Sequence, residues 1–286
     1  MSTKDGTIIK SRPELGLEGL RFQGFMRDFP KHFHDYYVIG FIERGRRRLF
    51  AGGRERLLKE GEAVVFNPQD DHGCRAADGR PLHYLGLHIE ARTLEKLAGR
   101  LFGREFRPRF TALPSALALE VKYFHDFFMA EEQTRAVETA FEEFLKKILT
   151  RAVPGNEDII GGQQGLEAAR TVMERKFAEP LSLERLSSVA GMSKYHFLRA
   201  FSRRTGLSPH SYLLALRVAR ARELLAEGWT LSEAALQTGF VDQSHFSNRF
   251  KTITGLTPDS YRRSREFGSR PGRPGEISPG EQGFIE

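Results

Sequence analysis

The sequence predicts a two-domain α+β protein: a small β-barrel followed by amphipathic helices, then an all-α domain. Three observations support this prediction. Short alternating segments punctuated by glycine fill the stretch from about 22 to 90, and a helical period replaces them near 115. A pattern of 20 residues then occurs twice, at Ser193–Tyr212 and at Asp242–Tyr261. The length of 286 residues suits two domains, each with its own core.

Composition and charge narrow the class of protein. Hydrophobic residues make up 40% of the chain, in short runs interrupted by charge, which predicts neither a membrane span nor a signal peptide. Cys74 is the single cysteine, so no internal disulfide can form, as is usual in a reducing cytosol. Of the net charge of +7, residues 164–266 supply 16 basic against 10 acidic residues, a difference of +6. A basic second half indicates a polyanionic partner.

Residues 1–110 are predicted to form the β-barrel, after a loose start over 1–20. Its strand candidates are short and separated by turns, which is typical of a small sandwich or barrel. Gly52-Gly53 is a hairpin turn signal. The strand candidates are Tyr37–Ile42, Arg48–Ala51, Glu62–Phe66 and Leu82–Ile89.

Residues 111–152 change to a helical period. Two apolar stripes indicate one or two amphipathic helices, which either pack on the barrel or pair two chains as a homodimer. The first stripe is Leu117, Val121, Phe124 and Phe128, and the second is Val137, Phe141, Phe144, Leu145 and Ile148. Residues 153–165, rich in glycine and polar side chains, are predicted to be a linker, and residues 267–286 a disordered tail.

The repeated pattern predicts two helix-turn-helix units within residues 166–266. In the first unit a helix at Glu167–Phe177 precedes one capped by Ser182, and Ser193 caps the next helix after the turn at Gly191. Phe197 and Phe201 lie one turn apart on the inner face of that helix.

The second unit repeats this logic. Thr230 and Glu233 can form a capping box, Gly239 makes the turn, and Asp242 caps the following helix. The offset between the copies is 48 residues before the turn and 49 after it, so the second turn is one residue longer. Two helices joined by a short turn with glycine are the arrangement of the helix-turn-helix motif that binds DNA.

One long helix is expected to join the two units. Ser208 caps it, Pro209 takes its first position, and it can run to about Ala226. Eighteen residues span roughly 27 Å. Successive major-groove faces lie about 34 Å apart, so one chain could read two adjacent segments of duplex DNA.

The helix after the glycine turn in each unit, capped by Ser193 or Asp242, is here called the reading helix. The exposed positions of the two reading helices are the candidate contacts to DNA. Arginine suits guanine, and glutamine or asparagine suits adenine, whereas other basic residues suit phosphates. The candidates are Lys194, Tyr195, Leu198, Arg199 and Arg203 in the first unit, and Gln243, Ser244, Ser247, Asn248 and Lys251 in the second.

The two segments AGMSKYHFLRAFSRRTGLSPHSYL and GFVDQSHFSNRFKTITGLTPDSYR resemble the paired helix-turn-helix signatures of the AraC/XylS transcription regulators. The resemblance covers about 100 residues, 164–265. It implies a regulator that binds asymmetric promoter DNA and usually activates transcription, with RNA polymerase as a partner. At Leu198 and Asn248 the sequence is less basic or polar than some members, which concerns base preference and not fold.

The segments HFHDYYVIGFIERGRRRL and GEAVVFNPQDDHGC resemble the cupin-like sensor barrel of the same family. This looser resemblance covers residues 22–90 and implies a small-molecule effector, and helices after the barrel that often pair two chains. Candidate effector contacts are Tyr36, Arg44, His72 and His83, whereas Arg46, Arg47 and Arg48 are expected to be mostly solvated.

His32, His34 and His72 leave an alternative open, a metal-dependent cupin enzyme fused to a DNA-binding domain. Two histidines at i and i+2 on a strand point to one face, and a third can come from another strand. The acidic ligand expected four or five residues after His34 is absent, since Val38 and Ile39 stand there. No catalytic triad, phosphate-binding glycine loop or zinc-finger spacing is present. The sequence therefore favours a regulator that is not an enzyme, with no cofactor.

Overall fold

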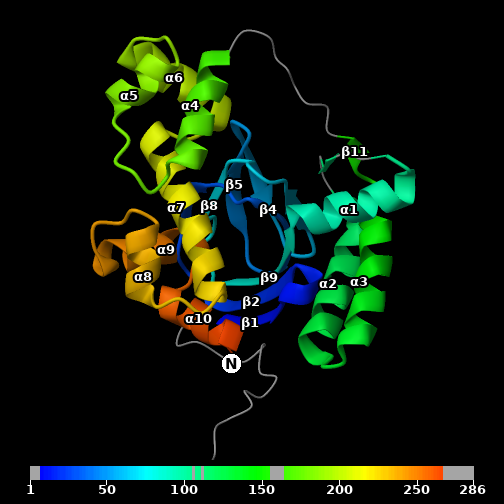
Figure 1. Cartoon of the computed structure of the whole chain (residues 1–286). Coiled ribbons are helices and arrows are strands. Elements are labelled where there is room, and N and C mark those ends of the chain that lie inside the picture. The colour runs from blue at the N-terminus through cyan, green and yellow to red at the C-terminus, as the bar shows by residue number, and fades with distance from the viewer. Residues whose placement is uncertain (1–6, 105–106, 111–112, 155–163, 267–286) are drawn as a thin grey trace, which may run out of the picture.

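The computed structural model describes residues 7–104, 107–110, 113–154 and 164–266, without the side chains of 153–154, 203 and 264–266. A β-barrel lies in the middle of the molecule (Figure 1). Helices α1–α3 cover one side of it, and the helices of the second half lie on the other side. The predicted two-domain α+β fold is confirmed.

Two antiparallel sheets form the barrel. The strand order of the five-stranded sheet is β1-β2-β9-β4-β7, and that of the four-stranded sheet is β3-β8-β5-β6. Glycine turns predicted between strands are present: Gly52 and Gly53, both with positive φ, join β5 to β6. The strands are β1 (Thr7–Arg12), β2 (Leu17–Phe25), β3 (Phe29–His32), β4 (Tyr36–Arg44), β5 (Arg47–Ala51), β6 (Arg54–Leu58), β7 (Ala63–Phe66), β8 (His72–Ala76) and β9 (Leu82–Glu90).

The start of the chain is more ordered than the sequence suggests. The prediction of a loose start over residues 1–20 is wrong from Thr7 onward, because β1 and β2 pair along their length. Residues 1–6 lie outside the described part. The inward positions of β1 include the buried Thr7 and Ser11, so polar side chains hide the alternation that would have indicated a strand.

Helices α1 (Ala91–Phe102), α2 (Ser115–Ala130) and α3 (Thr134–Leu149) pack on the five-stranded sheet. Val121, Phe124 and Phe128 of α2 are buried in one core with the outer face of β4 and β9, whereas Leu117 is only partly buried. The second stripe, on α3, joins the same core. These two stripes therefore serve packing within the chain and are not a free dimer surface.

The predicted linker is shorter in the structure. Strand β11 (Val153–Pro154) pairs with β10 (Pro108–Arg109), and helix α4 begins at Gln164. Residues 155–163 between them, and the predicted tail 267–286, lie outside the described residues.

The second half contains two similar units at the two ends of one long helix, α7 (Figure 1). Every predicted cap is present: the side chains of Ser182, Ser193, Ser208 and Asp242 each accept a backbone N–H, and Thr230 with Glu233 forms the capping box. The helices are α4 (Gln164–Arg175), α5 (Leu183–Val189), α6 (Lys194–Thr205), α7 (Pro209–Ala226), α8 (Leu231–Gln237), α9 (Gln243–Thr254) and α10 (Pro258–Glu266). In the described part of the chain, none of the helices combines the length and apolar character that crossing a bilayer requires.

Candidate functional site

The reading helix of the first unit, α6, presents an open outer face. Phe197 and Phe201 hold its inner face in the core of that unit, as predicted. Tyr195 is 69% exposed, and the Arg199 guanidinium lies over its ring at 5.5 Å. All of the predicted contacts on α6 whose side chains are described are exposed: Lys194, Tyr195, Leu198 and Arg199. The side chain of Arg203 lies outside the described part.

The reading helix of the second unit, α9, is exposed at its start and covered toward its end. Gln243, Ser244 and Asn248 are exposed, whereas Ser247 and Lys251 are half-buried. Asn248, Lys251 and Thr252 line a crevice whose other wall is Phe25, Arg27, Asp28 and Phe29 of the barrel. The barrel therefore lies against part of the predicted DNA-reading face of α9.

A cavity of about 100 Å³ lies inside the barrel, and α9 closes it. Ile253 and Thr254 from the end of α9 line it together with barrel side chains such as Phe22, Phe29 and Tyr84. No aspartate or glutamate is among the described residues that line it. The cavity is thus largely apolar, and its lining comes from both domains, mostly from the barrel and in part from α9.

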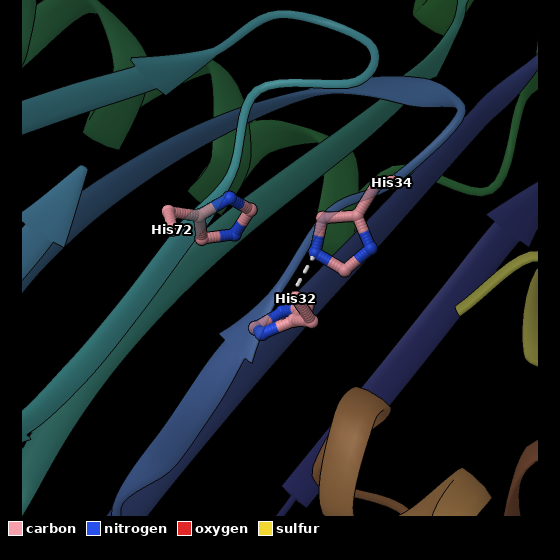
Figure 2. Close-up of side chains that lie close together, drawn as sticks. All are labelled: His32, His34 and His72. Carbon is pink, nitrogen blue, oxygen red and sulfur yellow. Dashed lines mark hydrogen bonds between the residues drawn. The ribbon is translucent and has the colours of Figure 1, made fainter. Parts of the chain in front are cut away.

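Three histidines converge at this cavity (Figure 2). His32 ends β3, His72 begins β8 directly opposite it, and His34 lies just before the bend at Asp35 that leads into β4. The prediction that His32 and His34 share a strand is wrong for His34, but the bend still turns both rings to one side. One ring nitrogen of each residue lies within 4.8 Å of those of the other two.

His32 and His72 are buried and His34 is half-buried, and the pKa of each imidazole is lowered, which favours the neutral form. Burial lowers the pKa of His32 to about 4, against a partial opposing effect of its hydrogen bond to the Pro30 carbonyl. Burial, followed by the neighbouring imidazoles, lowers the pKa of His34 and of His72 well below the ordinary value. Neutral imidazole is the form that binds metal ions.

A buried ionic network connects this cluster to the DNA-reading half. Tyr36 lies 2.9 Å from Nδ1 of His34, and the Arg222 guanidinium of α7 stacks on the Tyr36 ring at 4.2 Å. Arg222 also donates to Glu18 of β2 at 3.0 Å, and the two side chains are only 11% and 4% exposed. Glu18 in turn lies 3.1 Å from Nδ1 of His88.

The predicted effector residues divide into two pairs. Tyr36 and His72 line the cavity. Arg44 and His83 do not: they are cross-strand neighbours at the far ends of β4 and β9, and Arg44 is exposed.

Arg47, expected to be mostly solvated, is 1% exposed and lines the cavity. Its guanidinium donates to the backbone carbonyls of Phe25, Arg46 and Arg80, while Nε has no hydrogen-bond partner within the described part of the chain. Successive side chains of β5 point to opposite faces of the sheet, and Leu49 is buried. Arg47, two residues earlier, could have been predicted to point inward on this ground.

Matching glycines end both reading helices, and both touch the barrel. Gly206 and Gly255 have φ of 70° and 79°, a conformation that favours glycine. A Cβ on Gly206 would lie 2.0 Å from Asp71, and one on Gly255 would lie 3.1 Å from the Phe29 ring. The first unit thus contacts a polar loop of the barrel, and the second contacts its aromatic core.

Two helix-turn-helix units on one chain, beside a barrel with an internal cavity, define a ligand-binding transcription regulator. The profile of an AraC-like ligand binding domain matches residues 14–153, and that of a helix-turn-helix domain matches 186–264. The chain belongs to the AraC/XylS family of transcriptional regulators, with a ligand-binding domain followed by a DNA-binding domain.

Individual relatives agree with this assignment. The HTH-type transcriptional regulator YbfI of Bacillus subtilis (strain 168) is 35% identical, over 82% of this chain and 86% of that protein. The transcriptional activator RhaS of Enterobacter sp. (strain 638) is 26% identical, over 83% and 89%. Apo ToxT of Vibrio cholerae strain SCE256 has a similar fold, with a TM-score of 0.53 and 13% identity, over 89% of this chain and 98% of that chain.

Proposed function

We propose that this protein is a transcription activator whose second DNA-reading unit is held by the barrel until an effector enters the cavity. One observation carries the proposal: Ile253 and Thr254 of the reading helix α9 form part of the cavity lining. A ligand in the barrel therefore touches the element that reads DNA. Coupling of this kind needs only that the ligand favours one arrangement of the two domains over another.

The size of the cavity supports this mechanism. Its volume of about 100 Å³ is well below that of ordinary ligand pockets, which measure roughly 300–1,000 Å³. An effector of usual size then requires more room, and the end of α9 is the part of the lining that belongs to another domain. Its displacement would also release Asn248 and Lys251 from the crevice beside Asp28.

The lining favours an effector with an apolar body and an anionic group. Leucine, valine and phenylalanine side chains supply most of the surface, Arg47 brings a positive charge, and no carboxylate lines the described cavity. The more distant ToxT of Vibrio cholerae has been solved with an unsaturated fatty acid, which is a ligand of this class. Tyr36 and His72 remain candidate effector contacts, and Arg47 is added to them.

On DNA, the two reading helices take the roles that their exposed residues allow. Arg199 and Asn248 are the strongest candidates for base contacts in the first and second units. Arg203 and Lys251 are better suited to phosphates. The remaining candidates at the groove are Lys194, Tyr195, Leu198, Gln243, Ser244 and Ser247. Helix α7, with 18 residues, spans about 27 Å between the units.

Further partners follow from the same assignment. We infer action in the cytoplasm on promoter DNA, with RNA polymerase as the partner of an activator; the relative RhaS is named an activator. A homodimer would use the outer face of α2, where Leu119, Tyr123 and Phe127 are 50%, 65% and 38% exposed at helical spacing. We also infer that the chain is not an enzyme, because its relatives are named as regulators and the described cavity lining offers no carboxylate base.

The experiment that tests the proposal is genome-wide DNA occupancy of the tagged protein, with a reporter fused to the strongest site. We expect discrete peaks, and reporter activity that rises in cells carrying Ile253→Trp, because the larger side chain fills the cavity and displaces α9. Uniform background occupancy would contradict a sequence-specific regulator. Discrete peaks with an unchanged reporter in Ile253→Trp would contradict the control by α9.

A further inference from the structure

The histidine cluster of the barrel has the features of a metal-binding site. We propose that His32, His34 and His72 bind one divalent ion of the zinc class, whose open coordination position receives the anionic group of the effector. This inference rests on the proposed function for the role of the ion, but the binding of the ion can be measured without it. Imidazole donors suit zinc, copper, iron and nickel among the first-row metals.

The outer nitrogen of each ring is already engaged. Nδ1 of His32 lies 2.7 Å from the Pro30 carbonyl, and Nδ1 of His72 lies 3.0 Å from the Asp70 carbonyl. A carbonyl can only accept, so both Nδ1 atoms carry the proton and both Nε2 atoms present a lone pair. Metal-binding histidines are oriented in this way, with the second ring nitrogen held by a backbone carbonyl, a carboxylate or water.

The inner nitrogens are poorly satisfied by one another. Nε2 of His32 and Nε2 of His34 are 3.2 Å apart, so one proton shared between them can satisfy that pair (Figure 2). Nε2 of His72 has no hydrogen-bond partner among the described residues. The shared proton satisfies two of the three inner nitrogens and none satisfies the third, so a cation that displaces this proton would be bound by all three.

The spacing suits an ion after side-chain rotation. Zinc binds imidazole nitrogen at about 2.0–2.1 Å, so two ligand nitrogens of a tetrahedral ion lie about 3.4 Å apart. The present nitrogens all lie within 4.8 Å of one another, so rotations that bring the widest pair closer by up to about 1.4 Å would complete the site. With three ligands, a tetrahedral ion keeps one position open.

The charge of the surroundings decides what fills the open position. Three neutral imidazoles leave the ion with its full double charge, and the described cavity lining contains Arg47 and no aspartate or glutamate. An anionic oxygen of a ligand therefore fits better than a neutral group. The apolar side chains around it suit the rest of such a ligand.

The site also lies beneath the contact with the first reading unit. The loop that ends at His72 contains Gln69, whose side chain accepts from Tyr212 at 3.1 Å and whose N–H donates to the His34 carbonyl at 2.8 Å. Gln69 has a φ of 71°, which is rare for a residue other than glycine. Ordering His34 and His72 around an ion would fix the loop on which the first unit sits.

The test uses the purified full-length chain, stripped with a chelator and titrated with Zn²⁺ or Co²⁺. We expect one equivalent of either ion in the wild type and in His83→Gln, a control histidine outside the cavity. Binding should weaken by about 100-fold or more in His34→Gln and His72→Gln, which each lose one of three ligands. X-ray absorption of the zinc-loaded wild type should report nitrogen ligands at imidazole distances, a readout that needs no variant.

Several outcomes would overturn the inference. They are a wild type that takes up no stoichiometric metal, variants that bind as tightly as the wild type, or a ligand shell without imidazole. Azide, a small anionic probe, should shift the visible spectrum of the Co²⁺ form, and no shift would refute the open position. Promoter binding by a chain that takes up no metal would refute the metal site alone. A metal-loaded chain without specific DNA sites would refute the proposed regulator and leave the ion site standing.

Discussion

The two reading units share a sequence pattern but not an environment. Phe197 and Phe201 of the first unit lie in a core to which, among the buried residues that the structure describes, the barrel contributes only Phe33. The equivalent Phe246 and Phe250 of the second unit lie in one core with many barrel side chains, including Phe22 and Phe25. The repeated sequence therefore determines the fold of each unit, whereas packing against the barrel determines how far each unit can move relative to it.

The second unit is therefore the one that an effector in the barrel can control. A unit whose core is continuous with the effector cavity cannot move without disturbing that cavity, and the reverse is equally true. The first unit instead touches the barrel through the polar loop at Gln69 and Asp71. We expect the second unit to respond to the effector, and the first unit to provide most of the affinity for DNA when no effector is bound.

The largest effect is expected from matched core truncations. Phe250→Ala and Phe201→Ala each remove a fully buried ring, at a cost of about 3–5 kcal/mol. Hydrogen exchange should show that Phe250→Ala speeds exchange in β3 and the second unit, while Phe201→Ala affects the first unit only. Equal loss of protection in the barrel for both variants would contradict the stronger attachment of the second unit to the barrel.

A somewhat smaller effect is expected at the buried ion pair between the domains. Arg222→Met keeps the packing volume but removes the ion pair with Glu18. Of the two contacts of Glu18 described above, the one with His88 remains. Loss of a charged hydrogen bond in a buried place costs about 1.5–3 kcal/mol. The fluorescence of Trp229, the single tryptophan, which lies between α7 and α8, should shift as the second unit leaves the barrel. Arg220→Met, at an exposed pair with Glu223 on the same helix, is the control and should leave the spectrum unchanged.

The stability of the opposite side of the barrel, where α2 packs, is expected to depend on pH through His125. Burial lowers the pKa of His125 from 6.5 to about 4, and its ring donates to the Leu20 carbonyl. Between these values the unfolded chain binds a proton that the folded chain does not, so the free energy of unfolding falls as the pH falls. One such group contributes about 1.4 kcal/mol per pH unit in this window.

Chemical denaturation across this range should therefore show a shallower pH dependence in His125→Gln, by about one proton. The buried histidines of the cavity respond in the same direction and remain in both proteins, so the difference isolates His125. A variant with the same pH dependence as the wild type would mean that His125 is not neutral in the fold.

The reading units could be predicted from sequence because their signals are local. Ser193 and Asp242 cap helices that begin one residue later, and Gly206 and Gly255 end them, so each rule spans a few residues. The strand predictions at Tyr37–Ile42 and Leu82–Ile89 agree with β4 and β9 for the same reason. The sequence does not indicate the first strand, because the buried Thr7 and Ser11 resemble surface positions.

The site could be predicted only in part, because its contacts join distant segments. Glu18 and Arg222 are 204 residues apart, and no local pattern pairs them. Arg47 was expected in solvent because a run of three arginines resembles an exposed strand. Arg44 and His83 were expected at the cavity mouth, whereas their register places them at the far end of the sheet. The histidine cluster was visible as a motif, but the closure of the cavity by Ile253 was not.

The smallest and most specific effect is expected on DNA. Arg199→Ala should weaken binding to the specific site by about 1–3 kcal/mol, with little change on random DNA, if Arg199 reads a base. Because α6 is open, this loss should be the same in the wild-type and Ile253→Trp backgrounds. Asn248 lies in the crevice beside the barrel, so Asn248→Ala should cost little in the wild type and a comparable amount only when α9 is displaced. Titration of the six proteins, the two parents and the two alanine variants in each background, with a labelled site fragment measures both differences. Equal losses on specific and random DNA would make Arg199 a phosphate contact, and an Asn248 effect independent of background would mean that the barrel does not restrain the second unit.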